Sequence, residues 1–214
     1  MKYKNIIFDL DGTLAHTQPG ITNGIIYASS QMGITNLPIE KTELYIGPSL
    51  QKFLKENSDL SSDQRTEFIT HMRKYYLETG YKESSLYDGI YELIQLLNQN
   101  QLNVYVCTAK YEVSAKKMIN FYNLDKYCKS VLGANDILHE KSELLKHLIQ
   151  SFDLDPLKSV MIGDRYTDIL GGKDNNCATI GVLYGYGSSQ EINECSPDYI
   201  ADSAQSIKNY ILEG

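Results

Sequence analysis

Residues 6–13 read IIFDLDGT, an apolar run followed by an Asp-Leu-Asp-Gly-Thr segment. The three apolar residues at the start of this stretch predict a short buried β-strand that ends at Asp9. If the end of that strand stays extended, Asp9 and Asp11 point to one side and Leu10 points to the other. A surface turn is the alternative, because Asp and Gly are common in turns, but a position directly after a buried strand favours a functional site.

The same pattern recurs along the chain: further short apolar runs each end at a polar residue or a glycine. The further runs are residues 104–107, 160–162 and 179–183. Between them, apolar side chains recur at helical spacing over residues 90–97 and 144–152. This alternation predicts an α/β protein, with a Rossmann-like parallel-sheet core and helices on both faces of the sheet.

The carboxyl ends of parallel strands share one edge of the sheet, and such sheets bind their ligands at that edge. Asp9, Thr108 and Asp164 each follow one of the predicted strands. We therefore expect these three side chains to lie together, although they are far apart in the sequence.

Residues 15–86 break the alternation, because they carry helical patterns and no convincing buried strand. Two apolar stripes consist of Ile21, Ile25, Ala28 and Met32 and of Phe68, Met72, Tyr75 and Tyr76. Ser61 and Gln64 have the spacing of a capping box, which predicts the start of the second of these helices.

The position of this helical block predicts two domains. A helical cap domain of residues 15–86 is inserted after the first strand, and residues 1–14 and 87–214 form the core domain. We place the hinges between them at residues 15–18 and 84–89.

Composition and charge limit the classes of function. The chain has 214 residues, 42% hydrophobic and 22% charged, and its net charge of −7 argues against binding to a nucleic-acid polymer. Its apolar runs are too short for a membrane span, and no apolar signal region precedes Asp9. The four cysteines form no C-x-x-C pair, which favours reduced thiols in a cytoplasmic protein. We expect a monomer or a weak homodimer.

Two neighbouring carboxylates repel each other, so Asp9 and Asp11 need a cation or a shared proton. Mg²⁺ is one solution, because it prefers carboxylate and phosphate oxygens. A carboxylate can also attack a phosphoryl group to form an aspartyl phosphate. The second carboxyl can protonate the leaving oxygen and later activate water.

Four segments in order resemble the motifs of the haloacid dehalogenase superfamily. Residues 9–13, DLDGT, resemble the first motif, and Thr108 at the end of the second core strand matches the second. Lys141 at the start of a helix matches the third, although Ser replaces the usual Pro after it, and residues 163–168, GDRYTD, match the fourth. The resemblance covers essentially the whole chain, the cap included.

This resemblance implies a role for each matched residue. Asp9 would be the nucleophile and a metal ligand, and Asp11 the general acid and base, with its backbone carbonyl on the metal. Thr108 and the amide of Ala109 would hold the phosphoryl oxygens, and Lys141 would neutralise charge between phosphate and nucleophile.

The remaining implied roles concern the metal and the phosphate. Asp164 would bind Mg²⁺, and Asp168 would support the metal site or its water. Gly12 and Thr13 of the first motif would belong to the phosphate-binding residues. Most of these roles fit phosphoryl transfer, a reaction that depends mainly on positioning of the substrate and stabilisation of its charge.

Two loops extend the resemblance. Residues 181–187, GVLYGYG, lack the spacing of nucleotide-binding loops but resemble a loop of phosphoglycolate phosphatases and 5′-nucleotidases. Residues 45–50, YIGPSL, resemble their substrate-facing loop, in which Gly47 and Pro48 would place the backbone near the substrate. A helix-breaking turn between two cap helices is the alternative for the second loop.

Each candidate residue also has a purely structural alternative. Thr108 could end a strand, Lys141 could be a solvated lysine, and Asp168 could be an ordinary acid at a helix N-terminus. A lysine in the first turn of a helix nevertheless hints at an anionic partner. We expect Lys110 and Arg165 to be solvated. Among the residues without a matched motif, we place His16 at the hinge.

The motifs together predict a magnesium-dependent phosphatase. It would hydrolyse a small phosphomonoester, phosphoglycolate- or nucleotide-like, through an aspartyl-phosphate intermediate. One alternative is a β-phosphoglucomutase-like mutase, which would return the phosphoryl group to the substrate. Another is a non-catalytic protein that binds a phosphate ligand, which predicts loss of at least one of Asp9, Asp11, Lys141 and Asp164.

Overall fold

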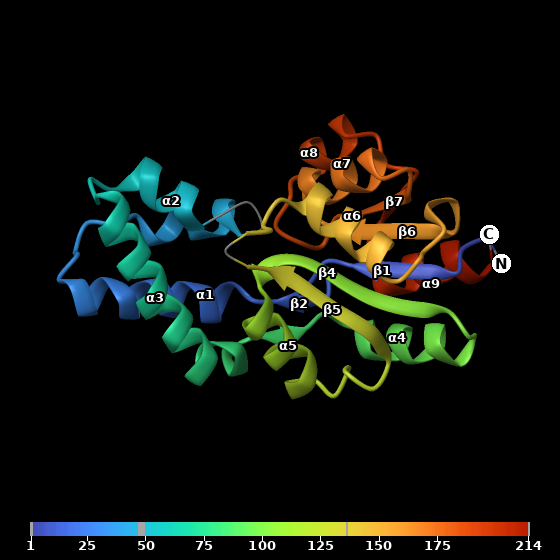
Figure 1. The fold of residues 1–214 in the computed structure, drawn as a ribbon, viewed down its shortest axis with the longest axis horizontal. Coiled ribbons are helices and arrows are strands. Elements are labelled where there is room, and N and C mark those ends of the chain that lie inside the picture. The colour runs from blue at the N-terminus through green and yellow to red at the C-terminus, as the bar shows by residue number, and fades with distance from the viewer. Residues whose placement is uncertain (1, 47–49, 136, 214) are drawn as a thin grey trace.

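The computed structural model describes residues 2–46, 50–135 and 137–213. Figure 1 shows a sheet with helices on both sides and, beside it, a block that contains helices α1, α2 and α3. Within the described residues, the main sheet has six parallel strands in the order β5-β4-β1-β6-β7-β8. Their bounds are Asn5–Phe8 for β1, Asn103–Tyr111 for β4, Cys128–Ala134 for β5, Ser159–Gly163 for β6, Ala178–Val182 for β7 and Tyr199–Ala201 for β8.

The register of the central strands brings three candidate site residues to one edge of the sheet. Phe8, the last residue of β1, pairs with Val106 of β4 and with Ile162 of β6. The three strands therefore run side by side, and their carboxyl ends deliver Asp9, Thr108 and Asp164 to one edge, as the sequence predicts.

The sequence predicts the four inner strands and misses β5 and β8, which are the two edge strands. Most residues of these two strands are half-buried rather than buried. An edge strand needs no continuous apolar run, so periodicity gives little signal there.

Helices cover both faces of the sheet, as predicted. Their bounds are Ile90–Gln99 for α4, Glu112–Phe121 for α5, Lys141–Ser151 for α6, Tyr166–Asp174 for α7, Ser189–Glu194 for α8 and Ala204–Glu213 for α9. Side chains of β1 alternate: Ile6 and Phe8 pack in the cluster that includes α4, α5 and α9, whereas Ile7 packs in the cluster that includes α6. The alternation follows from the period of two in a strand.

The helical block has a hydrophobic cluster of its own. Its elements are α1, Gln18–Met32; a 3₁₀ helix, Ile39–Tyr45; α2, Leu50–Asn57; α3, Ser62–Glu78; and a second 3₁₀ helix, Gly80–Glu83. Ile25, Phe53 and Phe68 from the three α-helices are fully buried in this cluster. The predicted capping box at Ser61 and Gln64 is confirmed.

Two short strands connect the helical block to the sheet. β2, Ala15–His16, pairs antiparallel with β3, Ser85–Leu86. We expected hinges without a strand in these segments; the structure pairs them because the entry to the block and the exit from it run side by side.

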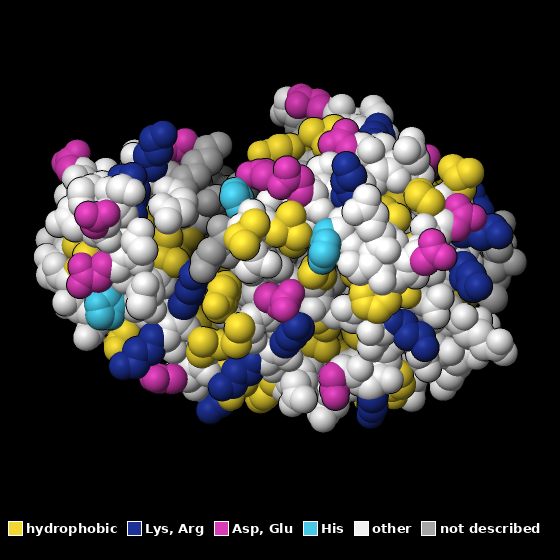
Figure 2. All heavy atoms as spheres, in the orientation of Figure 1, with side chains coloured by type: hydrophobic (Ala, Val, Ile, Leu, Met, Phe, Trp, Pro, Cys, Tyr) yellow, Lys and Arg dark blue, Asp and Glu magenta, His cyan; other side chains and the backbone are white. Residues whose placement is uncertain are grey.

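The surface carries charged side chains of both signs. Basic and acidic side chains are interspersed on the face that Figure 2 shows. In the part of the chain that the structure describes, none of the helices combines the length and the hydrophobicity that a membrane span requires. The four cysteines are free thiols, as expected.

Candidate active site

Four polar side chains lie buried at the carboxyl edge of the sheet. Asp9 directly follows β1, Thr108 lies in β4, and Asp164 directly follows β6, while Lys141 is the first residue of α6. Their exposed fractions are 5% or less. Because a buried charge is costly unless it is paired, this concentration points to a site rather than to general packing.

Three carboxylates and one ammonium form the centre of this edge. One oxygen each from Asp9, Asp164 and Asp168 lies within 4.8 Å of the others. Lys141 Nζ lies 2.7 Å from Asp9 Oδ1 and 2.8 Å from Asp168 Oδ1. With all three carboxyl groups ionised, three negative charges face one positive charge, and a divalent cation would balance the remainder. Carboxylate oxygens are also the ligands that Mg²⁺ prefers.

The electrostatics of the cluster show the same excess of negative charge. Burial raises the pKa of Asp164 to about 8, and the charges of Asp168 and Asp9 add to this effect. Burial also raises the pKa of Asp168 to about 6, against the opposing effect of Lys141. Burial lowers the pKa of Lys141, but Asp168 and Asp9 outweigh it, so its net pKa is raised.

Two loops are shaped around Asp164. The Thr13 hydroxyl donates to Asp164 Oδ1 at 2.9 Å, and the Tyr186 amide donates to Oδ2 at 2.8 Å. Gly12 has a φ of +84°, and a Cβ there would lie 2.2 Å from Asp164 Oδ2, so only glycine fits. A Cβ at Gly185 would likewise lie 2.3 Å from the Asp164 Cβ. Gly12 and Thr13, expected near the phosphate, thus contact the central carboxylate.

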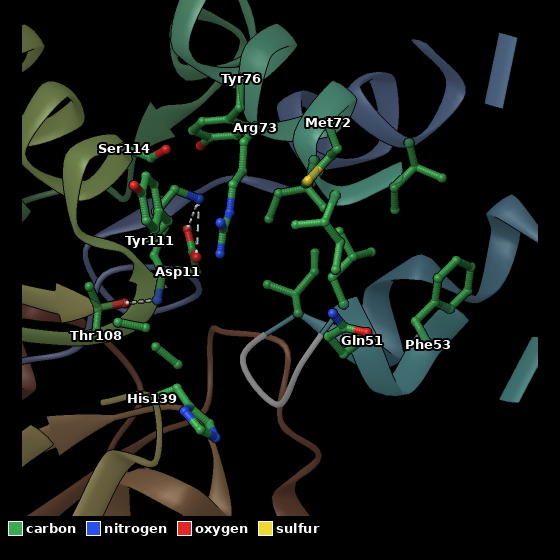
Figure 3. A pocket seen from close by; sticks show the side chains of 18 of the residues that line it. Asp11, Gln51, Phe53, Met72, Arg73, Tyr76, Thr108, Tyr111, Ser114 and His139 are labelled. Atoms are coloured by element: carbon green, nitrogen blue, oxygen red, sulfur yellow. Dashed lines mark hydrogen bonds and ion pairs between the residues drawn. The ribbon is translucent and has the colours of Figure 1, made fainter. Parts of the chain in front are cut away.

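A cavity of about 530 Å³ opens between the sheet edge and the helical block. On the sheet side, Asp9, Asp11, Thr108 and Ala109 line it. On the helical side its lining is mainly apolar and includes Ile21, Ile25, Leu50, Phe53, Ile69 and Met72. Figure 3 shows Arg73 pointing into the cavity toward Asp11; its Cζ lies 4.2 Å from the centre of the Tyr111 ring.

The Asp11 side chain stands apart from the three-carboxylate cluster and pairs with Lys110. Lys110 Nζ lies 3.0 Å and 3.2 Å from the two Asp11 oxygens, and the side chains are only 8% and 10% exposed. The prediction that Lys110 is solvated is therefore wrong. The ring of Tyr76 covers the ammonium, with its centre 3.9 Å from Lys110 Nζ. Tyr76 belongs to α3, which lies far from Lys110 in the sequence.

The sequence profile described as haloacid dehalogenase-like hydrolase matches residues 6–182. The chain belongs to this hydrolase family. A 5′-nucleotidase from Pseudomonas aeruginosa is 35% identical to it, over 95% of this chain and 94% of the relative. A phosphoglycolate phosphatase from Vibrio vulnificus is 28% identical, over 98% and 96% of the two chains.

A solved structure agrees with the family membership. The crystal structure of a predicted phosphatase from Clostridium acetobutylicum matches this hydrolase with a TM-score of 0.92 and 29% identity, over 100% of both chains. The predicted α/β fold and the resemblance to the superfamily are thereby confirmed.

The prediction that Arg165 is solvated is also wrong for this hydrolase. Its side chain is 8% exposed, and Nε lies 2.9 Å from Glu191 Oε1. Nη1 donates to the carbonyl oxygen of Ile46, which lies in the helical block. Arg165 therefore joins the sheet edge to that block, a long-range contact that no local pattern reveals.

The other expected residues have the following places. Asp168 is fully buried and accepts from the Arg165 amide at 3.1 Å, so it is more than an exposed helix acid. Thr108 Oγ1 accepts from the Lys110 amide at 3.2 Å. His16 lies in β2, with its ring centre 6.0 Å from that of Tyr186. Gly47, together with residues 48 and 49, lies outside the described residues.

Sequence reasoning missed two tyrosines beside the site, of which one contacts the helical block and the other the loop after β1. The Tyr186 hydroxyl accepts from the amides of Thr17 and Gln18 at 2.7 Å and 2.9 Å, where α1 begins. The Tyr184 hydroxyl donates to the carbonyl of Thr13 at 3.0 Å. Both come from the loop GVLYGYG, whose tyrosines were the available signal.

Proposed function

We propose that this hydrolase is a magnesium-dependent phosphatase that cleaves a small phosphomonoester with Asp9 as its nucleophile. The observation that carries the proposal is the place of Asp9: it lines the cavity and pairs with Lys141 at 2.7 Å. Asp164 and Asp168 lie next to it. The names of the two relatives support the same class of reaction.

In the first half of the reaction, an Asp9 carboxylate oxygen attacks the phosphorus and the bond to the ester oxygen breaks. The protonated Asp11 gives its proton to the leaving oxygen, and an aspartyl phosphate remains. Thr108 and Ala109 line the cavity, and in this proposal the Thr108 hydroxyl and the Ala109 amide donate to the phosphoryl oxygens. Lys141 neutralises negative charge on Asp9 and on the phosphoryl group.

In the second half, water attacks the phosphorus of the aspartyl phosphate, and the bond to the Asp9 oxygen breaks. The Asp11 carboxylate takes the proton of the water, and inorganic phosphate leaves. Asp11 suits both tasks because it lines the same cavity as Asp9 without belonging to the carboxylate cluster.

Asp9, Asp164 and Asp168, with the backbone carbonyl of Asp11, would hold the Mg²⁺. The fit rests on a set of buried oxygen donors with an excess of negative charge. When bound, the ion supplies positive charge that stabilises the phosphoryl group during transfer.

The cavity favours a substrate larger than phosphoglycolate. Its volume of about 530 Å³ lies in the range of sites for drug-sized ligands, and its helical side is mainly apolar. A glycolate group is small and charged, and it would leave most of this apolar wall without contact. Among the two classes expected, we therefore propose a nucleoside monophosphate, whose base would cover the apolar wall.

A phosphosugar mutase on the same scaffold is the second candidate, and a non-catalytic phosphate-binding protein is the third. Both the mutase and the phosphatase would use Asp9 as phosphate carrier, but only the phosphatase releases inorganic phosphate without isomerising its substrate. The non-catalytic candidate ranks last because Asp9, Asp11, Lys141 and Asp164 are all present.

The chain divides into two domains in this proposal. We propose that residues 15–86 act as a cap domain on a core of residues 1–14 and 87–214. The separate hydrophobic cluster of the helical block supports this division, as does the pairing of β2 with β3 at the two connections.

Phosphate release over a panel of phosphoesters tests the proposed function. We expect nucleoside monophosphates to exceed phosphoglycolate in kcat/KM, and activity to disappear on chelation of Mg²⁺ and to return when it is restored. The variant Asp9→Asn should be inactive, whereas Asp125→Asn, at an exposed position of the core, should match the wild type. Full activity after exhaustive chelation or in Asp9→Asn would contradict the proposal.

A further inference from the structure

The buried pair of Lys110 and Asp11 is the strongest feature that the proposed reaction leaves unexplained. The ammonium contacts both oxygens of the carboxylate, at 3.0 Å and 3.2 Å, and both side chains are at least nine-tenths buried. Figure 3 shows these two contacts as dashed lines at Asp11. A cation that contacts both oxygens limits rotation of the carboxylate, so it determines where the carboxylate points.

The lysine is itself held from two sides. Its amide donates to the Thr108 hydroxyl oxygen at 3.2 Å, which ties its backbone to the sheet edge. Its Nζ lies 3.9 Å from the ring centre of Tyr76, a favourable contact between a cation and an aromatic face. Tyr76 belongs to α3 but is buried against the main core, and its hydroxyl lies 3.0 Å from the sulfur of Met118.

The position of the pair suits the second half of the reaction. Asp11 lines the same cavity as Asp9 and stands apart from the carboxylate cluster. A water that attacks an aspartyl phosphate on Asp9 meets a base there only if the Asp11 carboxylate is held in that cavity, and the two contacts with Lys110 hold it.

We propose that Lys110 is a positioning residue that holds the Asp11 carboxylate as the base for hydrolysis of the aspartyl phosphate, with Tyr76 of the helical block holding the lysine. In this step the water oxygen bonds to phosphorus, the bond from phosphorus to the Asp9 oxygen breaks, and the water proton moves to an Asp11 oxygen. The inference rests on the proposed function, because it requires the aspartyl phosphate.

A chromogenic substrate separates the two halves of the reaction. p-Nitrophenolate leaves without needing a proton, so with p-nitrophenyl phosphate the first half should depend little on Asp11. Rapid mixing with this substrate and Mg²⁺ shows formation of the aspartyl phosphate as a burst of nitrophenolate, and its hydrolysis as the slower steady rate. Acid quenching measures the phosphorylated protein directly.

For Lys110→Met we expect a burst close to one nitrophenolate per active site, followed by a steady rate reduced about tenfold or more, because positioned acid–base catalysis contributes about 10²–10⁴-fold. Lys110→Arg, which keeps the cation, should recover part of the steady rate. Tyr76→Leu should also lower the steady rate. It should lower it more than Tyr76→Phe does, because phenylalanine keeps the aromatic ring. Lys116→Met, at an exposed position of α5, is the matched control and should behave like the wild type.

Two results would overturn the inference: an unchanged steady rate in Lys110→Met, or a burst and a steady rate that fall together. If Lys110→Met does not fold, as thermal unfolding would reveal, Lys110→Arg and the two Tyr76 variants decide by the same comparison. Failure of the proposed function would look different. In that case the acid-quenched wild type would carry no phosphoryl group that is absent from Asp9→Asn.

Discussion

Lys141 Nζ lies 2.7 Å from Asp9 Oδ1, and both side chains are 4% exposed. The same ammonium lies 2.8 Å from Asp168 Oδ1. Lys141, the first residue of α6, is thus the cation that two buried carboxylates share: that of the proposed nucleophile and that of Asp168, in the motif that follows β6.

Replacement of this lysine should affect both stability and activity. Lys141→Met leaves buried carboxylates without their cation, and breaking such a pair costs about 3–5 kcal/mol in the free energy of unfolding. Phosphate release should fall more than about 100-fold, the order of loss when a charge-stabilising donor is removed. Urea unfolding and a phosphate assay measure the two effects. Lys146→Met, exposed on the same helix, is the control, and equal behaviour of the two variants would refute this role.

Stabilisation by Mg²⁺ should depend on pH through Asp164. Burial raises the pKa of Asp164 to about 8 in the folded, metal-free protein, against an ordinary value of 3.8. The folded state then binds more protons than the unfolded state between these values, so its stability falls as the pH rises through this window. Mg²⁺ needs the carboxylate, so its binding becomes more favourable as the proton leaves.

Thermal unfolding with and without Mg²⁺ checks this expectation. The Mg²⁺-induced rise in Tm should be larger at about pH 8 than at about pH 6, because the proton competes with the ion. Asp164→Asn should lose most of the rise at both pH values. An equal rise at both values in the wild type would show that Asp164 does not take part.

Gly12 should tolerate no side chain. In Gly12→Ala the new Cβ would lie 2.2 Å from Asp164 Oδ2, at a φ of +84°, so the turn or the carboxylate must move. We expect loss of most phosphatase activity and a destabilisation of about 1–3 kcal/mol. Gly33→Ala is a matched control, because Gly33 also has a positive φ of +65° but nothing within 4 Å of the added Cβ.

The control variant should lose only the cost of the left-handed backbone, about 1–2 kcal/mol of stability, and keep its activity. Phosphate release and thermal unfolding of the two alanine variants, measured side by side, give the comparison. If both variants keep full activity, the close approach of Gly12 to Asp164 is not required.

Much of the site follows from local sequence patterns. The run before Asp9 and the run before Asp164 are buried on both faces of the sheet, so their apolar residues predict strands directly. The shared edge of a parallel sheet then places Asp9, Thr108 and Asp164 together. Lys141 could be placed at a helix start by its motif.

Contacts between distant segments were beyond prediction. Lys110 is buried because Tyr76 covers it, and Arg165 is buried because it reaches Ile46; each pair joins the sheet edge to the helical block. Burial of a charged residue by another segment leaves no periodic signal near that residue. The edge strands β5 and β8 were missed for a related reason, since half-buried strands lack a continuous apolar run.

Trapping of the phosphorylated protein shows directly whether Asp9 is the nucleophile. The wild type is mixed rapidly with substrate and Mg²⁺, quenched in acid and digested, and the peptide that contains Asp9 is analysed by mass spectrometry beside that of Asp9→Asn. We expect a phosphoryl group on Asp9 within one turnover and none in the variant. A wild type that turns over without phosphorylated Asp9, or that carries the phosphoryl group on another residue, would contradict this expectation.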